Sequence, residues 1–358
     1  MIDKLEKIFI PLAEKIGKNR YLLAIRDGFL LTTPLLIIGS FFLLVANFPI
    51  PNWVEFWAKF FGDNWTSYMS KPTNATFDIM AIFAVIGIAY SFSRELNVDK
   101  LSGAAVALVS WFILMPYSVT DGNVTLPGIP LGWIGSKGIF VGIITAFISV
   151  HIYAFVKKKG WMIKMPEGVP PAVTQSFEAL VPSAVVLTIF FLINILFSLT
   201  PYGNAFDFIF KCLQGPLQSL GSTVGAVLIA MGFQHVFWFF GINGGSIVGS
   251  IMQPILTPLS MENLAAYQAG NPLPHVINQQ FYDLFTTFGG AGSTLSMVIA
   301  MVLFCKSKRI KDLSRISFAP ALFGINEPII FGLPIVLNPM ILIPFLLTPL
   351  INLSLIHI

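Results

Sequence analysis

Uncharged apolar runs divide this chain into segments that are long enough to cross a lipid bilayer. A membrane-spanning α-helix needs about 20 predominantly apolar residues. Runs of roughly that length cover residues 28–54, 101–120, 138–156, 179–200, 221–242 and 284–305. A shorter run, 77–93, carries Asp78, and a last apolar run covers 329–352. The pattern predicts an all-α integral membrane protein, a polytopic helical bundle with about eight spans in this chain.

The composition supports that class. The chain is 55% hydrophobic and 11% charged, whereas soluble domains carry about 25% charged residues. Its two cysteines have no metal or redox spacing, its four histidines lack ligand spacing, and no phosphate-binding loop is present. We therefore expect no metal, no cofactor and no nucleotide-driven chemistry of its own.

Basic residues predict the sidedness of the chain. Most of the 21 Lys and Arg fall in residues 1–27, 94–100, 157–164 and 306–315. Because cytoplasmic loops are enriched in positive charge, we place the N-terminus and the loops 94–100 and 157–164 in the cytoplasm. Residues 1–27 also show apolar positions at helical spacing, which predicts an amphipathic surface segment. Segment 243–283 is rich in Gly and Pro, so its topology, and with it the side of loop 306–315, stays open.

One glutamate, Glu327, lies within a long uncharged stretch, between Gly324 and Pro328. A charge at the bilayer centre costs about 2.5–3.5 kcal/mol on insertion scales, and Gly and Pro break regular helix there. Interrupted helices at membrane depth mark transport sites. The alternatives are a structural carboxylate paired with an arginine and a polar binding site, of which we favour the site.

Further polar and aromatic residues gather in the two interrupted segments, 243–283 and 316–340, and in the span between them. Carboxylates and amides bind sugar hydroxyls, and aromatic rings stack on pyranose faces, so this set fits a sugar. The candidate site residues are Trp238, Asn243, Gly244, Gln280, Asp283, Gly290, Ser293, Asn326 and Glu327. The alternative is that the aromatics form an interface belt, the glycines permit helix packing and the amides of residues 278–280 belong to a wetted loop. We interpret His235 as a helix-to-helix hydrogen bond rather than a ligand.

With the stretches 238–245 and 324–328 in view, the chain resembles the IIC permease of the sugar phosphotransferase system (PTS), in the lactose/cellobiose/diacetylchitobiose branch. The resemblance implies a homodimer with about ten helices and two re-entrant hairpins in the bacterial cytoplasmic membrane. Residues 28–200 would form the dimerisation half and 201–352 the sugar-binding half. The family's glutamate falls on Glu327, near the sugar C6 hydroxyl, and its stacking tryptophan falls on Trp238.

The resemblance also implies that the permease carries a β-linked disaccharide, such as cellobiose or diacetylchitobiose, inward. A phosphocysteine on a separate IIB protein then phosphorylates the sugar, and IIB in turn works with a IIA protein. The phosphoryl-carrying residues would thus lie on these partners, which leaves open whether the chain counts as an enzyme. Rival functions are an ion-coupled transporter that releases unmodified sugar, a membrane-embedded hydrolase or transferase, and a sugar sensor.

Two features depart from the family pattern. Asn243 stands where many relatives carry histidine, and an amide cannot titrate near neutral pH. Relatives also continue for about two more spans, and residues 353–358 read as a sequencing artefact, so we expect the sugar-binding half to be truncated. The sugar itself is not identified.

Overall fold

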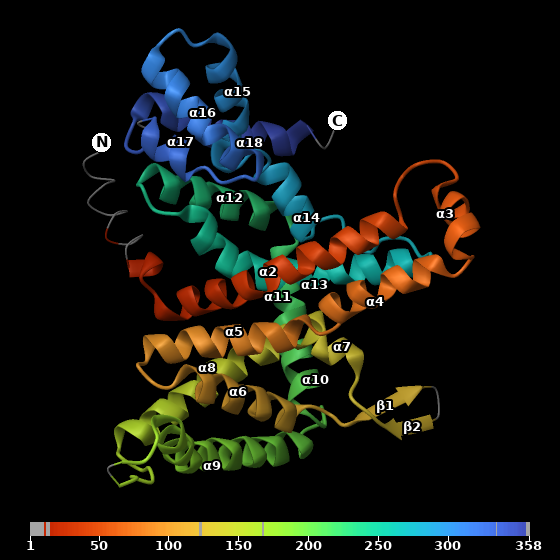
Figure 1. Ribbon diagram of the computed structural model, residues 1–358, viewed down its shortest axis with the longest axis vertical. Helices are drawn as coiled ribbons and strands as arrows, with labels where there is room; N and C mark the ends of the chain where they lie inside the picture. Colours follow the sequence, from red (N-terminus) through yellow and green to blue (C-terminus); the bar gives the residue numbers. More distant parts are fainter. Residues whose placement is uncertain (1–10, 12–14, 122–123, 167, 334, 356–358) are drawn as a thin grey trace. The chain divides into compact units, whose positions relative to one another are not determined.

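The computed structural model of the protein describes residues 11, 15–121, 124–166, 168–333 and 335–355 (Figure 1). Five described helical segments are long and apolar enough to span a membrane: Arg20–Ala46, Trp65–Glu95, Ser136–Lys158, Pro171–Ser198 and Gln279–Phe304. The halves Ala205–Gly221 and Val224–Phe239 meet at 77° and make a sixth candidate. The helical membrane class is therefore confirmed, whereas the full helix count and the re-entrant hairpins stay predictions. Residues 1–10 and 12–14 of the predicted surface segment, and residues 356–358 of the predicted artefact, lie outside the described residues.

Residues 24–216 form one compact unit, here called unit 2. Its elements, in chain order, are α2 (Arg20–Ala46), α3 (Trp53–Phe61), α4 (Trp65–Phe77), α5 (Met80–Glu95), α6 (Lys100–Leu114), β1 (Ser118–Asp121), β2 (Val124–Pro127), α7 (Leu131–Ile134), η1 (Ser136–Gly138), α8 (Ile139–Lys158), α9 (Pro171–Ser198), α10 (Ala205–Ile209) and η2 (Phe210–Gln214). Helix α11 (Gly215–Gly221) follows at the boundary.

A β-hairpin corrects the all-α prediction. Helix α6 ends at Leu114, short of the predicted run 101–120, because Pro116 follows. Proline lacks an N–H and disfavours helical geometry in the residue before it, and Met115 is extended, with φ −77° and ψ 138°. Strands β1 and β2 then pair in antiparallel register. The length of the uncharged run 101–120 alone predicts these residues to be the end of a span.

Helix α5 carries much of the core of unit 2, where it packs against α6 and α8. Its side chains Met80, Ile88 and Phe92 are fully buried. Helix α2 approaches α5 through glycines: a Cβ on Gly28 would lie 2.8 Å from the backbone nitrogen of Ile88, and one on Gly87 2.9 Å from the Cα of Gly28. Only glycine permits backbones to come this close.

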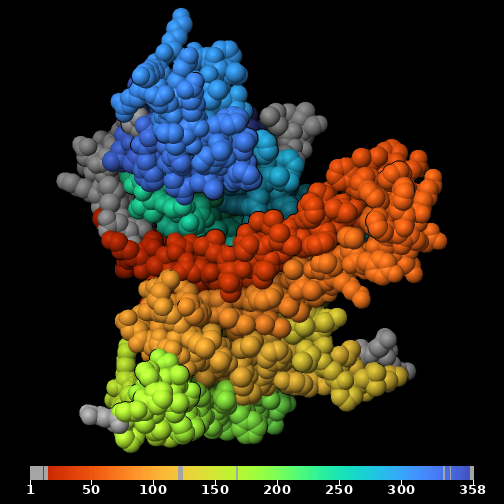
Figure 2. Space-filling view, in the orientation of Figure 1, coloured from red at the N-terminus to blue at the C-terminus, as the bar shows by residue number. Residues whose placement is uncertain are grey.

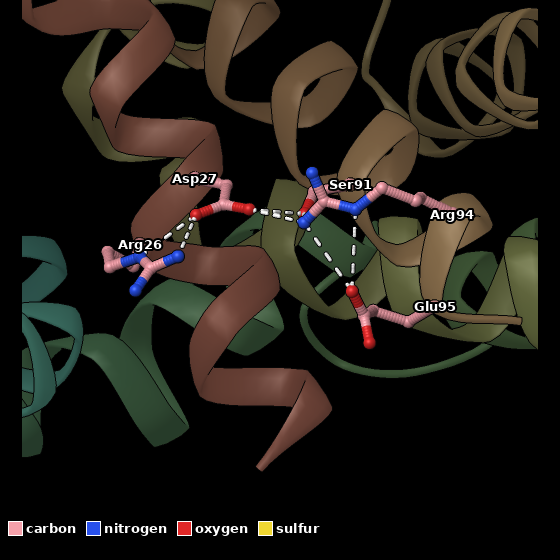
Figure 3. A network of polar contacts seen from close by, with 5 residues as sticks. All are labelled: Arg26, Asp27, Ser91, Arg94 and Glu95. Atoms are coloured by element: carbon pink, nitrogen blue, oxygen red, sulfur yellow. Dashed lines mark hydrogen bonds and ion pairs between the residues drawn. The ribbon is translucent and has the colours of Figure 1, made fainter. Parts of the chain in front are cut away.

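A polar network joins the same two helices next to the glycine contact (Figure 3). Asp27 on α2 accepts hydrogen bonds from Arg26 at 2.6 Å, from the Ser91 hydroxyl at 3.0 Å and from Arg94 at 2.7 Å. Arg94 also lies 3.4 Å from Glu95. Since the arginine side chains are 36% and 49% exposed, each ion pair contributes only about 0–1 kcal/mol. The network therefore sets the register of α2 on α5 more than it stabilises the unit.

Helix α3 projects from the rest of unit 2 and has no buried residue. It appears in orange on the right of Figure 2. Its rings contact one another: Trp53 packs edge-on against Trp57 at 5.6 Å, and Trp57 stacks on Phe61 at 5.7 Å. Tryptophan rings such as Trp53 and Trp57 are typical of the boundary between lipid and water.

The chain from Leu217 onward, together with the described residues before Ala24, forms unit 1. Its elements after α11 are α12 (Val224–Phe239), α13 (Gly244–Gln268), α14 (Gln279–Phe281), η3 (Tyr282–Thr286), η4 (Ala291–Ser293), α15 (Thr294–Phe304), α16 (Lys308–Leu322), α17 (Glu327–Gly332) and α18 (Pro339–Leu355). Its core includes the fully buried Val298, Ala321, Ile329 and Ile330.

The break in helix that is predicted within 243–283 lies nearer the end of this segment than the positions of Pro254 and Pro258 indicate. Helix α13 runs unbroken through Pro254 and Pro258, both buried, and the chain leaves helical geometry only after Gln268. Proline is tolerated inside buried membrane helices because neighbouring groups satisfy the freed carbonyls. Sequence alone does not reveal whether such neighbours exist.

Candidate functional site

Glu327 is the first residue of α17, directly after the break that ends α16. Gly324 adopts φ 74°, a left-handed conformation that suits glycine, and so turns the chain. Pro328 follows at the first turn of α17, where its missing N–H costs nothing. The carboxylate is half-buried. The predicted break at this glutamate is therefore present.

Asn243 provides the contact to Glu327. Its Nδ2 donates to Glu327 Oε1 at 2.9 Å, while its Oδ1 accepts from the backbone N–H of Ser246 at 2.8 Å and caps α13. Both ends of the amide are thus used, and its orientation is fixed. The two segments meet although they are 84 residues apart. Asn243 and Glu327 form the centre of the candidate site.

Gly244 allows the turn that carries Asn243 to approach α12. A Cβ at this position would collide with the carbonyl oxygen of Gln234 and lie 3.0 Å from its Cα. Backbone atoms cannot rotate away, so any side chain would displace the turn. Gly244 therefore acts through the backbone position of its neighbour Asn243.

No cation is paired with Glu327 within the part of the chain that the structure describes: no Lys, Arg or His nitrogen lies within 4.0 Å of it. Nor do the described His, Cys, Asp and Glu side chains form a group able to hold a metal ion. The alternative of a carboxylate held by an arginine is thus not supported among these residues.

Asn326 is 2% exposed and ties the turn before Glu327 to the glycine-rich loop 288–293. Its Nδ2 donates to the carbonyl of Ala291 at 3.0 Å and to the Thr294 hydroxyl. Gly290 lies against the same amide, because a Cβ there would overlap it. Ser293 accepts from Asn352 Nδ2 at 2.8 Å. The predicted residues Gly290, Ser293 and Asn326 are therefore brought into one assembly.

Gln280 and Asp283 lie apart from these contacts. Both are exposed, and Asp283 accepts from Gln279 Nε2 at 2.9 Å. No hydrogen bond among the described residues joins either one to Asn243, Asn326 or Glu327. Their role in binding stays a prediction.

Trp238 packs into the core of unit 1 beside the site. Its side chain is 4% exposed, and its ring meets Phe331 edge-on at 6.4 Å. Its indole nitrogen would lie 3.8 Å from a Cβ on Gly245. Whether the ring also stacks on a sugar stays a prediction.

His235 makes the inter-segment hydrogen bond predicted for it. Its Nε2 accepts from the backbone N–H of Gly292 at 2.8 Å, so α12 contacts the glycine-rich loop. The identity of this partner could not be derived from the sequence. A second contact at the site, the hydroxyl of Thr294 that accepts from Asn326, is not among the candidate residues predicted above. The Gly-rich composition of 289–293 was the available signal that this loop needs outside anchors.

Comparison with known proteins agrees with this arrangement. The model of the family "Phosphotransferase system, EIIC" matches residues 26–349. The chain belongs to this family. The lichenan permease IIC component of Bacillus subtilis is 42% identical over 99% of this chain and 80% of that protein. The cellobiose-specific EIIC component of Geobacillus stearothermophilus is also 42% identical, over 95% of this chain and 77% of its own length.

A solved structure supports the same assignment. The crystal structure of ChbC, the IIC component of the N,N'-diacetylchitobiose-specific phosphotransferase system, superposes with a TM-score of 0.93 and 44% identity. It covers 98% of this chain, which matches 83% of that one. The protein is accordingly a multi-pass permease component of a bacterial sugar PTS, which works with its sugar and with IIB and IIA proteins.

Proposed function

We propose that this EIIC protein binds a β-linked disaccharide such as cellobiose or diacetylchitobiose and presents its C6 hydroxyl to phosphorylated IIB. The observation that carries the proposal is the half-buried Glu327 carboxylate. One oxygen is held by Asn243 at 2.9 Å, and no donor to the other oxygen is found among the described residues. A carboxylate that is oriented through one oxygen can accept a hydrogen bond from a sugar hydroxyl with the other oxygen.

In the proposed transfer, the C6 oxygen forms a bond to phosphorus while the S–P bond of the phosphocysteine on IIB breaks. The hydroxyl proton passes to Glu327, and the cysteine thiolate leaves. A carboxylate within hydrogen-bonding reach orients the hydroxyl and draws off its proton. The relatives named for cellobiose, lichenan and diacetylchitobiose support the choice of a β-linked sugar.

We further propose that the protein works as a homodimer with its N-terminus in the cytoplasm and with two re-entrant hairpins in the sugar-binding half. The basic clusters 94–100 and 157–164 support the sidedness. The left-handed turn at Gly324 and the glycine-rich loop 288–293 support irregular backbone at membrane depth, which is tolerated where it faces protein or a cavity.

The test compares Glu327→Gln with Glu178→Gln in inverted membrane vesicles supplied with phosphoenolpyruvate, the general PTS proteins, IIA and IIB. Glu178 pairs with Lys157 at 3.5 Å in unit 2, so it is a matched carboxylate outside the site. We expect Glu327→Gln to lower cellobiose phosphorylation by about 100-fold or more, the scale of a general base, while Glu178→Gln stays near wild type.

Near-normal phosphorylation by Glu327→Gln would contradict the assigned role. Uptake of unmodified cellobiose without phosphoenolpyruvate would favour the ion-coupled transporter. Parallel assays with N,N'-diacetylchitobiose and lactose would identify the preferred sugar.

A further inference from the structure

A buried histidine that makes no contact with Glu327 anchors the loop beside the site. His235 is 1% exposed. Its Nδ1 lies 2.7 Å from the carbonyl oxygen of Met231, and its Nε2 lies 2.8 Å from the backbone nitrogen of Gly292. Because a carbonyl only accepts and an N–H only donates, Nδ1 must carry the proton and Nε2 must be free. These two partners together require the neutral ring in a single tautomer.

The loop held by this ring has an irregular backbone that only short turn contacts support from within. Gly289, Gly290 and Gly292 have φ values of 69°, 81° and 67°, and Ser293 has φ 53°. Positive φ at a residue other than glycine is strained, so Ser293 adds strain to a stretch in which four of the five residues 289–293 have positive φ. The stretch's own backbone bonds are local turn contacts, such as Ser293 N–H to the carbonyl of Gly290 at 2.9 Å. The Gly292 N–H bonded to His235 therefore provides an external anchor for the loop.

The same loop supports Glu327 through Asn326. Ala291, which precedes Gly292, accepts from Asn326 Nδ2 at 3.0 Å. Asn326 precedes Glu327, and its amide contacts Gly290 so closely that no Cβ fits there. A shift of Gly292 would therefore move the acceptor of Asn326 and, through it, the backbone of Glu327.

We propose that His235 is a positioning residue for phosphoryl transfer: its neutral imidazole holds the Gly292 N–H and thereby fixes Asn326 and the Glu327 carboxylate against the sugar hydroxyl. The inference rests on the proposed function of Glu327. The alternative is a core histidine that only fills space beside Phe345, whose ring meets it edge-on at 5.2 Å.

Two amide substitutions separate these roles. In His235→Gln the terminal oxygen reaches the position of Nε2 and can accept from Gly292. In His235→Asn the amide reaches only the position of Nδ1, so it can donate to Met231 but leaves the Gly292 N–H without an acceptor. Each variant is purified in detergent and checked for monodispersity. Cellobiose affinity and the cellobiose phosphorylation rate with phosphorylated IIB at saturating sugar are then measured beside wild type and Glu327→Gln.

We expect His235→Asn to lower the phosphorylation rate by about tenfold, which corresponds to about 1.4 kcal/mol, with a much smaller change in cellobiose affinity. His235→Gln should recover most of that rate. Three outcomes would overturn the proposal: equal activity of the two variants, an effect confined to cellobiose affinity, or aggregation of both variants. Each of these outcomes would give His235 a purely structural role or none. If Glu327→Gln itself keeps the wild-type rate, the proposed function fails first, and the two failures are thereby distinguished.

Discussion

Gly290→Ala offers a sharp test of the contacts that position Glu327. Gly290 has φ 81° and ψ −173°, a region that is essentially restricted to glycine and costs other residues about 1–3 kcal/mol. The added Cβ would also overlap the side-chain amide of Asn326. Because Asn326 is buried, its amide can move only by breaking its bonds to Ala291 and Thr294.

Each of these hydrogen bonds contributes about 0.5–1.5 kcal/mol. The backbone and hydrogen-bond penalties together predict that Gly290→Ala destabilises the native loop by about 2–6 kcal/mol. The thermal unfolding midpoint in detergent should fall, and cellobiose phosphorylation should fall further, because the displaced side chain belongs to the residue preceding Glu327.

The matched control is Gly232→Ala within α12. A Cβ at Gly232 meets no atom within 4 Å and its φ is not positive, so alanine there should be neutral or stabilise the helix by up to about 1 kcal/mol. If Gly290→Ala and Gly232→Ala have the same midpoint and the same phosphorylation rate, the coupling between the loop and Glu327 is refuted.

Three further substitutions test other parts of the structure. Gly87→Val should lower the unfolding midpoint by the equivalent of about 1–3 kcal/mol, because its Cβ would lie 2.9 Å from the backbone of α2; an unchanged midpoint would contradict that helix crossing. Asn243→Asp should abolish phosphorylation while keeping the α13 cap, since it places a second carboxylate against Glu327; a wild-type rate would contradict the contact. Asp99→Ala should cost about 0.5–2 kcal/mol by removing the α6 cap. Partial burial raises the pKa of Asp99, but hydrogen bonds from the first turn of α6 and the charge of Lys157 outweigh it, so the pKa of this carboxyl is lowered. Its contribution to stability should therefore be complete above the unfolded pKa of about 3.9 and be lost as the pH falls through the lower folded value; a difference between wild type and variant that persists below that value would contradict the assignment.

Much of the site could be located from the sequence because its determinants are local. A glutamate between Gly324 and Pro328 in an uncharged stretch identifies both a break in the helix and a polar group that needs a partner. Glycines at 289, 290 and 292 likewise indicate backbone that helices cannot provide. These features depend on residue type and spacing alone, so a single sequence reveals them.

The partners of these groups could not be predicted, because they depend on contacts between distant segments. The sequence presents Asn243 as an amide able to bind sugar, and only the structure joins it to Glu327. The hairpin after α6 was missed for a related reason. The uncharged run continues past Pro116, and periodicity cannot distinguish the end of a span from apolar strands outside it.

Three polar side chains around the site are each held by two hydrogen-bond contacts, in two arrangements. His235, Asn243 and Asn326 each make two hydrogen-bond contacts: His235 and Asn243 each use one within their own segment and one across to another, whereas Asn326 directs both to the 291–294 segment. Each orientation is fixed by an acceptor-only carbonyl or a donor-only N–H, so none of them can rotate to accommodate a ligand. Glu327 differs, because only one of its carboxylate oxygens has a donor among the described residues. A preorganised site needs this asymmetry: rigid groups that set the position of the carboxylate, and one acceptor left for the hydroxyl that is to lose its proton.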